Sequence, residues 1–416
     1  MAELEMRAVA GDRDAASAWV RGVFTGFLDR GADVSQEEME LRLARQELSR
    51  AVGFFDGDRC VATFNSFPQR VTTVGGGQVS ANAVSAVTVT ATHRRRGLLT
   101  RMMLPDLRAA KERGEPVATL IAAEYRIYGR FGFGPATGFV NWRVRKARSG
   151  WDGSWSTAGL AGELSMVEDA EVRRLLPELH ANCRAGTPGM VDRNDFHWDR
   201  ITRQITTSPA PPATLNAVYR DADGTPRGVV CFTVAKDWDT GLPDGTATVR
   251  LMYAADDAAE RALWRLLLSL DWVTTVDSGP ARPDAPLPLL LPDPRAASVV
   301  ETGDQLWLRP LDVPALLTAR SYPAAGELVL EVRDPLGLAG GRFLLSAGPD
   351  GASCAATTRS ADLTLDVGTL GRFYLGEDSV AALVAAELVA EHTNGAADRA
   401  DLLFRTGRRP WCPDIF

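Results

Sequence analysis

The stretch over residues 84–112 constrains the fold more than any other part of the chain. An apolar, β-branched run ends at a small polar turn, and three arginines at 94–96 and then Gly97 follow. Residues 98–112 place apolar and charged side chains on opposite sides of a helix, so the stretch predicts a strand, a basic turn and a helix. The free N–H groups and the dipole at a helix N-terminus attract anions, and a glycine lets the backbone approach a phosphate. We therefore expect an anion-binding turn, and the alternative is a solvated basic turn before a surface helix.

A second motif follows at the distance that one strand–helix–strand unit requires. Residues 117–123 form an apolar run typical of a buried strand, and Tyr128-x-x-x-Gly132-Phe133 comes next. A phenol suits the role of general acid, because its hydroxyl can give a proton to a leaving group. Two alternatives stay open: a core tyrosine whose hydroxyl caps a nearby group, and Tyr125 as the donor, although it lacks the Gly-Phe register.

Both motifs resemble those of the GNAT N-acetyltransferases. Arg94-x-x-Gly97-x-Leu99 after a strand is similar to their pyrophosphate loop, Arg/Gln-x-x-Gly-x-Gly/Ala, and Leu99 departs from the last position. The Tyr128 motif resembles the signature that follows the fifth strand of that fold. The resemblance implies that the two strands splay apart around the pantetheine arm of an acyl-CoA. It also implies a tyrosine hydroxyl near the thioester sulfur, where the thiolate leaving group takes up a proton.

Composition argues against several other classes of protein. A length of 416 residues indicates two or three domains, and a net charge of −7 argues against bulk nucleic-acid binding. No apolar run reaches membrane-spanning length, and the acidic start of the chain does not read as a signal peptide, so we expect a cytoplasmic protein. The five cysteines and four histidines show neither a disulfide framework nor metal-ligand spacing, so we expect no metal.

The order of the patterns divides the chain into parts. Two helices within residues 12–50 and a hairpin at 52–67 precede the two motifs, and residues 141–144 read as the last strand of this part. A stretch rich in Gly, Ser and Ala at 147–162 reads as a domain junction. We therefore expect a first domain over residues 1–148.

The order hairpin, strand and helix returns in the middle of the chain. A hairpin at 215–234, a strand at 247–253 and a helix at 258–270 repeat it, but the turn over 254–260 has no glycine and three acids. Acids there would repel a pyrophosphate, so we expect a second GNAT-like domain that has lost cofactor binding. An unrelated α/β domain is the alternative. Further strands and an apolar helix at 379–391 are expected near the end of the chain.

The whole chain resembles the Eis (enhanced intracellular survival) family of actinobacterial N-acetyltransferases. Val87-Thr88-Val89, Arg94-Arg95-Arg96-Gly97-Leu98-Leu99 and residues 127–137 carry the resemblance, and Leu99 is that family's own form of the loop. The resemblance implies an α/β (α+β) fold with tandem GNAT folds, the first active and the second inactive, and a C-terminal sterol-carrier-protein-like α/β domain. The corresponding boundaries are 1–148, 149–310 and 311–416.

The resemblance also implies the partners and the site residues. Acetyl-CoA would be the co-substrate, amine-bearing small molecules such as aminoglycosides the acceptors, and a homohexamer the assembly. Tyr128 would be the general acid and the α-carboxylate of Phe416 the general base. The cofactor-binding residues would be Val87, Thr88, Val89, Arg95, Arg96, Gly97, Leu98, Leu99, Thr100, Ala123 and Glu124. A protein-lysine N-acetyltransferase and a non-catalytic acyl-CoA or lipid-binding protein are the alternative functions.

A base is required on chemical grounds, because an amine with a lysine-like pKa of about 10.4 is protonated near neutral pH. No histidine lies within the motifs, and His93 precedes the loop. The tail over residues 411–416 is apolar and stiffened by two prolines, which suits docking better than fraying. An α-carboxylate with a pKa of about 3.5 is a weak base unless burial raises that pKa. We therefore expect an enclosed Phe416 carboxylate, with a water relaying the proton.

Overall fold

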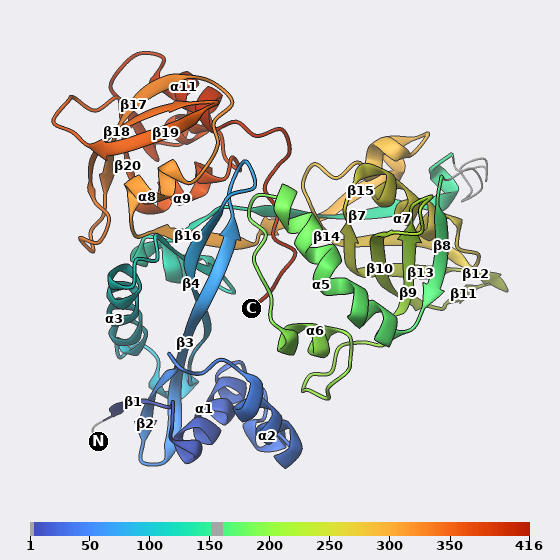
Figure 1. The fold of residues 1–416 in the computed structure, drawn as a ribbon. Helices are drawn as coiled ribbons and strands as arrows, with labels where there is room; N and C mark the ends of the chain where they lie inside the picture. The colour runs from blue at the N-terminus through green and yellow to red at the C-terminus, as the bar shows by residue number, and fades with distance from the viewer. Residues whose placement is uncertain (1–3, 151–160) are drawn as a thin grey trace. The chain divides into compact units, whose positions relative to one another are not determined.

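The computed structural model of the chain describes residues 4–150 and 161–416 (Figure 1). The chain forms two compact units, which we call unit 1 (residues 1–137, 306–407 and 414–416) and unit 2 (residues 138–305 and 408–413). Each unit combines segments from either side of the boundaries expected at 148/149 and 310/311, because strands from distant parts of the sequence enter the same sheet, and those boundaries stay predictions. Part of the junction expected at 147–162 lies outside the described residues.

The N-terminal part of unit 1 is a seven-stranded sheet in the order β1-β2-β3-β4-β5-β16-β6. Its strands are β1 Glu5–Ala8, β2 Val52–Asp56, β3 Arg59–Thr72, β4 Gln78–Val89, β5 Val117–Ile121, β16 Leu306–Pro310 and β6 Gly134–Pro135. Its helices are α1 Arg13–Gly26, α2 Gln36–Arg45, α3 Leu98–Glu112 and the short α4 Tyr125–Tyr128. The helices, the hairpin and the strands predicted for residues 12–131 are therefore present, and α3 has the bounds expected from the sequence.

Neighbouring phenylalanines on β2 show how the two faces of this sheet are covered. Phe54 packs in a core cluster with Leu98, Met102 and Leu107 of α3, whereas Phe55 packs in a second cluster with Trp19 of α1. Successive side chains of a strand point to opposite faces, so the sheet lies between α1 and α3. This arrangement fixes α3 against the strand that precedes it in sequence.

One strand expected in the first sheet lies in the second sheet, and a strand from residues 306–310 takes a place in the first. Residues 141–144, expected to close the first sheet, belong to β7 Gly138–Arg145, which pairs with β14 and β15 in unit 2. The place between β5 and β6 is taken by β16, whose Leu306 pairs with Ile121 and whose Trp307 pairs with Pro135. All five residues of β16 are buried, as suits a central strand, and such long-range pairing leaves no local signal in sequence.

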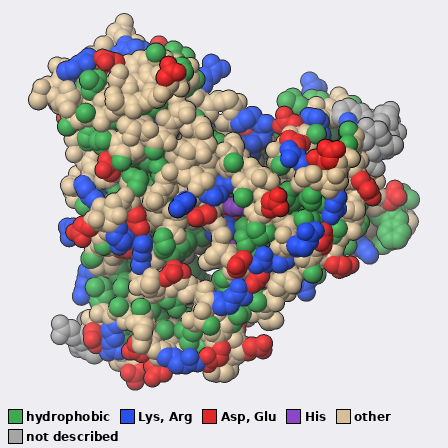
Figure 2. Space-filling view, viewed as in Figure 1, with side chains coloured by type: hydrophobic (Ala, Val, Ile, Leu, Met, Phe, Trp, Pro, Cys, Tyr) green, Lys and Arg blue, Asp and Glu red, His purple; other side chains and the backbone are tan. Residues whose placement is uncertain are grey.

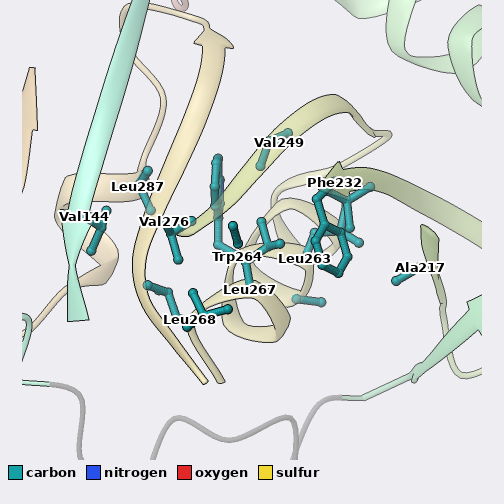
Figure 3. Packing of buried hydrophobic residues seen from close by; sticks show 14 of the residues in the cluster. Val144, Ala217, Phe232, Val249, Leu263, Trp264, Leu267, Leu268, Val276 and Leu287 are labelled. Atoms are coloured by element: carbon teal, nitrogen blue, oxygen red, sulfur yellow. The ribbon is translucent and has the colours of Figure 1, made fainter. Parts of the chain in front are cut away.

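Unit 2 contains a second seven-stranded sheet, in the order β15-β7-β14-β13-β10-β9-β8. The new strands are β8 Glu163–Val167, β9 Leu215–Arg220, β10 Pro226–Ala235, β13 Gly245–Ala254, β14 Val273–Ala281 and β15 Ala297–Asp304, and the helices are α5 Asp169–Gly186, α6 Asp195–Ile201 and α7 Asp257–Ser269. The strands β11 Trp238–Asp239 and β12 Leu242–Pro243 form a separate small hairpin. Figure 3 shows Leu263, Trp264 and Leu267 of α7 packed toward Val249 and Val276 of the sheet.

The C-terminal part of unit 1 is built on a five-stranded sheet in the order β19-β18-β17-β20-β21. Its elements are β17 Gly326–Arg333, β18 Gly341–Gly348, β19 Gly351–Ala356, β20 Leu363–Asp366, β21 Val389–Glu391, α8 Val313–Thr318, α9 Val367–Tyr374, α10 Val380–Ala385 and α11 Ala396–Phe404. The single helix expected at 379–391 is wrong. Glu387 has a φ of 58°, which ends the helical path, and Val389 pairs with Leu365 of β20.

Two surface properties bear on function. Within residues 4–150 and 161–416, no helix is both long and apolar enough to cross a bilayer. On the face shown in Figure 2, basic and acidic side chains are interspersed rather than gathered by sign. That face therefore offers no basic track of the kind that follows a nucleic-acid backbone.

Buried thiols predict that stability falls at alkaline pH. Burial raises the pKa of Cys60, Cys183 and Cys231 to about 12, from an ordinary value of 9.0. Above pH 9 the unfolded chain releases these protons while the folded chain keeps them, so the free energy of unfolding should fall by about 1.4 kcal/mol per thiol for each pH unit. Denaturant unfolding from pH 8 to pH 11 measures this slope, which Cys60→Ala should reduce. A flat profile over that range would contradict the prediction.

Candidate active site

The strands β4 and β5 separate near the middle of the first sheet. They pair in parallel over Ala81–Ala83 and Val117–Thr119 only, and β4 then continues to Val89 along β3 while the end of β5 pairs with β16. Because the two strands are parallel, their carboxyl ends lie at the same edge of the sheet, and both predicted motifs follow those ends. The splayed strands expected from the resemblance are therefore present.

A bulge in β4 directs the backbone of the separated segment. Ala86 has a φ of 50°, and its carbonyl accepts a hydrogen bond from Thr63 Oγ1 at 2.7 Å. The Thr88 hydroxyl also lies 2.7 Å from Thr63 Oγ1, so the Thr88 side chain is committed inside the protein. The Thr90 N–H donates to Val61 O on β3 at 2.9 Å, so the backbone groups of Thr90 face β3. Successive residues of a strand point these groups to opposite sides. The polar backbone groups of Val89 therefore face away from β3.

The turn between β4 and α3 combines a bare helix end with exposed arginines. Gly97 is the N-cap residue of α3, with a φ of 73°, and no side chain caps this helix end. The first-turn N–H groups are those of Leu98, Leu99 and Thr100, which an α-helix leaves without intrahelical partners. Arginines 94–96 are all exposed next to them. A Cβ placed on Gly97 would meet no protein atom within 4 Å, so the space above this helix end is open to an anion.

One residue of this turn was not predicted from the sequence. His93 is 7% exposed, and its Nδ1 lies 2.9 Å from the hydroxyl of Thr92 and 3.1 Å from that of Thr90. Its Nε2 lies 3.8 Å from Asp56 at the β2–β3 turn. His93 therefore braces the start of the loop, and a lone histidine in sequence gave no sign of that role.

Substitution of Gly97 by valine should weaken binding of the expected acyl-CoA by about tenfold or more, the loss expected for one charge-assisted hydrogen bond. The side chain would occupy the open space beside the helix end and block close approach of a phosphate. Gly114→Val is a matched control, because Gly114 has a φ of 77°, also faces open space, and lies at the other end of α3. Calorimetry showing equal losses in both folded variants would contradict the assignment of the loop.

Tyr128 is a buried phenol whose hydroxyl is uncommitted. The side chain is 7% exposed and belongs to the core cluster that includes Leu98, with partly buried Val87 and Val89 packed against that cluster. Its ring meets that of Phe133 edge-on at 6.3 Å, and its hydroxyl makes no hydrogen bond within the described residues. Burial raises the pKa of Tyr128 to about 12, and the charge of Glu124 adds to the rise. The phenol therefore stays protonated across the physiological pH range.

Tyr125, the competing tyrosine, is engaged elsewhere. Its ring packs edge-on against Trp307 at 4.8 Å, and its hydroxyl accepts a hydrogen bond from Arg372 at 2.9 Å. These three residues line a cavity of about 250 Å³ that Tyr128 does not line. Ala123 and Glu124, predicted to line the cofactor, are both exposed between the end of β5 and the start of α4.

Phe416 docks against the first sheet rather than fraying. Its ring packs edge-on against Phe67 at 5.9 Å, and Asp414 is 3% exposed. Phe67 on β3 pairs with Ala83 on β4, and Ala83 pairs with Thr119 in the last paired row of β4 and β5. The ring of Phe416 therefore lies against the row of the sheet at which the strands begin to separate.

The corresponding helix end in unit 2 is filled by a carboxylate. Strands β13 and β14 pair in parallel only over residues 245–248 and 273–277, as in the first sheet, but α7 begins after Asp256 rather than glycine. Asp256 accepts from the Ala259 N–H at 2.8 Å and from Arg227 Nη2 at 2.8 Å. Burial raises the pKa of Asp256, but the Ala259 N–H and Arg227 outweigh it, so the pKa lies below its usual value. A fixed negative charge thus occupies the place that a phosphate would need.

Metal chemistry has no visible centre in the described part of the chain. No group of three or more His, Cys, Asp or Glu side chains in residues 4–150 and 161–416 is arranged to hold a metal ion.

Comparisons with known proteins place the chain in a family. Family models match an Acetyltransferase (GNAT) domain at residues 8–136, a second Acetyltransferase (GNAT) domain at 189–310, and a Sterol carrier protein domain at 313–413. An uncharacterized N-acetyltransferase of Streptomyces griseus is 53% identical over 402 residues, 96% of each chain. The N-acetyltransferase Eis of Mycobacterium tuberculosis is 34% identical over 339 residues, 80% of each chain. The crystal structure of Eis1 from Mycobacterium abscessus superposes with a TM-score of 0.84 at 30% identity, covering 100% of both chains.

Proposed function

The chain belongs to the Eis-type GNAT N-acetyltransferases. From this we propose that it transfers the acetyl group of acetyl-CoA to primary amines of polycationic small molecules such as aminoglycosides. The observation that carries the proposal is the open N-terminus of α3 beside two separated strands, with a protonated phenol in the same core cluster. The reaction is a direct attack of the amine on the thioester, with Tyr128 as general acid and the α-carboxylate of Phe416 as general base.

Acetyl-CoA lies along β4 and over the start of α3. Backbone groups of Val87 and Val89 bind the amides of the pantetheine arm, which suits a strand whose outward N–H and C=O groups have no neighbouring strand, and Thr88 between them keeps this backbone in place by pairing with Thr63 on β3. Arg95, Arg96, Gly97, Leu98, Leu99 and Thr100 surround the pyrophosphate. Ala123 and Glu124 line the opposite wall. The exposed arginines and the bare first turn of α3 support this placement.

Three protons move as the acetyl group transfers. The acceptor ammonium first gives one proton through a water to the Phe416 carboxylate, the free amine nitrogen attacks the thioester carbon and forms the new N–C bond, and that nitrogen loses its second proton to solvent as the amide forms. The C–S bond then breaks and the sulfur takes the Tyr128 proton. The ordinary pKa of an α-carboxylate is about 3.5, so its strength as a base depends on enclosure, which the packing against Phe67 supports.

The reaction is tested by incubating the protein with acetyl-CoA and a panel of aminoglycosides, while following thiol release and the mass of the products. We expect thiol release that depends on the amine, and products heavier by whole acetyl groups. Acetylation confined to lysine peptides would identify a protein-lysine acetyltransferase instead. Acetyl-CoA binding without turnover on any amine would identify a non-catalytic binding protein.

The proposal extends to the assembly and the location of the protein. We infer a homohexamer from the family resemblance, and light scattering of the purified protein measures its mass directly. None of the five cysteines, all of which lie in the described residues, forms a disulfide, and this supports a reducing, cytoplasmic location. A monomer in solution with full activity would remove the hexamer from the account.

A further inference from the structure

A fully buried ion pair joins the two parts of unit 1. Arg309 on β16 and Asp334, which follows β17, are both 0% exposed in their side chains, and Arg309 Nη2 lies 2.7 Å from Asp334 Oδ2. Asp334 also accepts the backbone N–H groups of Leu338 at 2.9 Å and Ala339 at 2.8 Å through the same oxygen. Its other oxygen accepts the Leu336 N–H at 3.1 Å. The turn after β17 is therefore folded around this carboxylate.

Such a pair is weak evidence for stability. The desolvation of two charges commonly cancels their attraction, and well-packed apolar side chains of the same volume often serve as well. A pair that is kept in a core therefore calls for another reason, such as fixing the position of a group that it touches.

The group that Arg309 touches belongs to the segment that follows Tyr128. Arg309 Nε donates to the carbonyl of Phe131 at 3.1 Å, and Nη1 donates to the carbonyl of Pro310. Phe131 is the last residue of the short 3₁₀ turn Gly129–Phe131, which starts directly after Tyr128. Holding the Phe131 carbonyl therefore restrains the backbone three residues from the phenol.

The motif glycine at 132 fits the same interaction. Gly132 has a φ of 83°, and a Cβ there would lie 2.8 Å from Val367 Cγ1 and 3.3 Å from Arg309 Nε. The turn therefore packs directly on the guanidinium and on the first residue of α9. A hydrogen bond from the Gly132 N–H to Gly129 O, at 2.9 Å, closes the 3₁₀ turn.

We propose that Arg309 and Asp334 are positioning residues for acyl transfer: the C-terminal part of unit 1, through Asp334, fixes the guanidinium that holds the Phe131 carbonyl and so sets the Tyr128 hydroxyl. The proposal rests on the proposed role of Tyr128 as general acid. It gives the sterol-carrier-like part a task in the reaction that requires no lipid.

Arg309→Lys tests the proposal, because lysine keeps a charge for Asp334 but cannot also reach the Phe131 carbonyl with a second, fixed N–H. We expect kcat to fall by about 10- to 100-fold, as small misplacements of catalytic groups do. The Kd for acetyl-CoA, measured by calorimetry, should stay within about twofold, because the loop at α3 is untouched. In the Tyr128→Phe background, Arg309→Lys should cause no further loss, since the group that it positions is already gone.

Arg320→Lys is the matched control. Arg320 is also a buried arginine of unit 1, 3% exposed, but it donates to the carbonyls of Tyr374 and Phe404 rather than to the Tyr128 segment. It should lower stability yet keep kcat per folded molecule. Asp334→Asn removes the charge from the other partner of the pair. It keeps one oxygen for the Leu338 and Ala339 N–H groups, although the Leu336 N–H loses its acceptor, so it serves if Arg309→Lys does not fold.

Each outcome separates the proposals. The positioning role alone would be overturned if the losses of kcat from Arg309→Lys and Tyr128→Phe multiply in the double variant. It would also be overturned if Tyr128→Phe is impaired while Arg309→Lys and Asp334→Asn keep the wild-type kcat. An unchanged kcat in Tyr128→Phe would overturn the general-acid assignment and this proposal with it. Equal loss of kcat in Arg320→Lys would show that the effect is one of general stability.

Discussion

Replacement of Tyr128 by phenylalanine should lower kcat by about 10²- to 10⁴-fold, the usual contribution of a general acid, while the affinity for acetyl-CoA stays nearly unchanged. The substitution removes one oxygen, and the packing of the ring against Phe133 is kept. Because the pKa of Tyr128 is about 12, the wild-type rate should show no alkaline decline from this group below about pH 10.5. Steady-state thiol release from pH 7 to pH 10.5 measures kcat of the variant and the pH dependence of the wild-type rate.

The competing tyrosine provides the control for this variant. Tyr125→Phe removes a hydroxyl that is already bonded to Arg372, so it should leave kcat close to the wild-type value. The reverse pattern, an impaired Tyr125→Phe and a fully active Tyr128→Phe, would move the proton donor to Tyr125 or to a water.

Deletion of Phe416 should remove most of the turnover while acetyl-CoA still binds. The deletion removes the ring that packs against Phe67 and moves the carboxylate away from the row of the sheet at which β4 and β5 separate. Without a base in reach, the acceptor amine stays protonated, and the loss should be about 10²- to 10⁴-fold. Thiol release gives the turnover, and calorimetry gives the affinity for acetyl-CoA.

Two further variants separate the carboxylate of Phe416 from its ring. Phe416→Leu keeps the main-chain carboxylate and changes only its anchor, so part of the activity should remain. One glycine added after Phe416 keeps the ring but displaces the charge, so it should be as inactive as the deletion. Full activity in the extended protein would remove this carboxylate from the mechanism.

The local elements of the fold could be predicted because their signals are local. The spacing of apolar residues over 98–112 predicted α3, and Asp56-Gly57-Asp58 lies at the turn between β2 and β3 as expected. In unit 2, the acids before α7 indicated a helix end unsuited to phosphate, and Asp256 is found capping it. Each of these depends on residues within a few positions of one another.

The partners of the strands could not be predicted in the same way. Nothing within residues 306–310 indicates that this segment enters a sheet formed by residues 5–135, and residues 138–145 show no sign of leaving it. The apolar run at 379–391 read as one helix because periodicity does not reveal that Val389 pairs with β20. Long-range pairing decided both cases.

The candidate site likewise contains residues with a local sequence signal and residues that only long-range contacts bring to it. Gly97, the arginines and Tyr128 could be proposed from the sequence because their motifs are compact, and the structure brings both motifs to one edge of the first sheet. Arg309 lies far from Tyr128 in sequence, and its hydrogen bond to Phe131 exists only because β16 is inserted between β5 and β6. The ring contact of Phe416 with Phe67 likewise depends on tertiary packing.

The most direct test of the central claim is the calorimetric stoichiometry of acetyl-CoA binding to the intact chain. One chain contains two GNAT folds. In the first, the N-terminus of α3 at Gly97 is open, and in the second, Asp256 caps the N-terminus of α7. We predict one acetyl-CoA per chain, with binding weakened by Gly97→Val and unaffected by Asp256→Asn. Two molecules per chain, or a single one that Asp256→Asn weakens and Gly97→Val does not, would contradict the account.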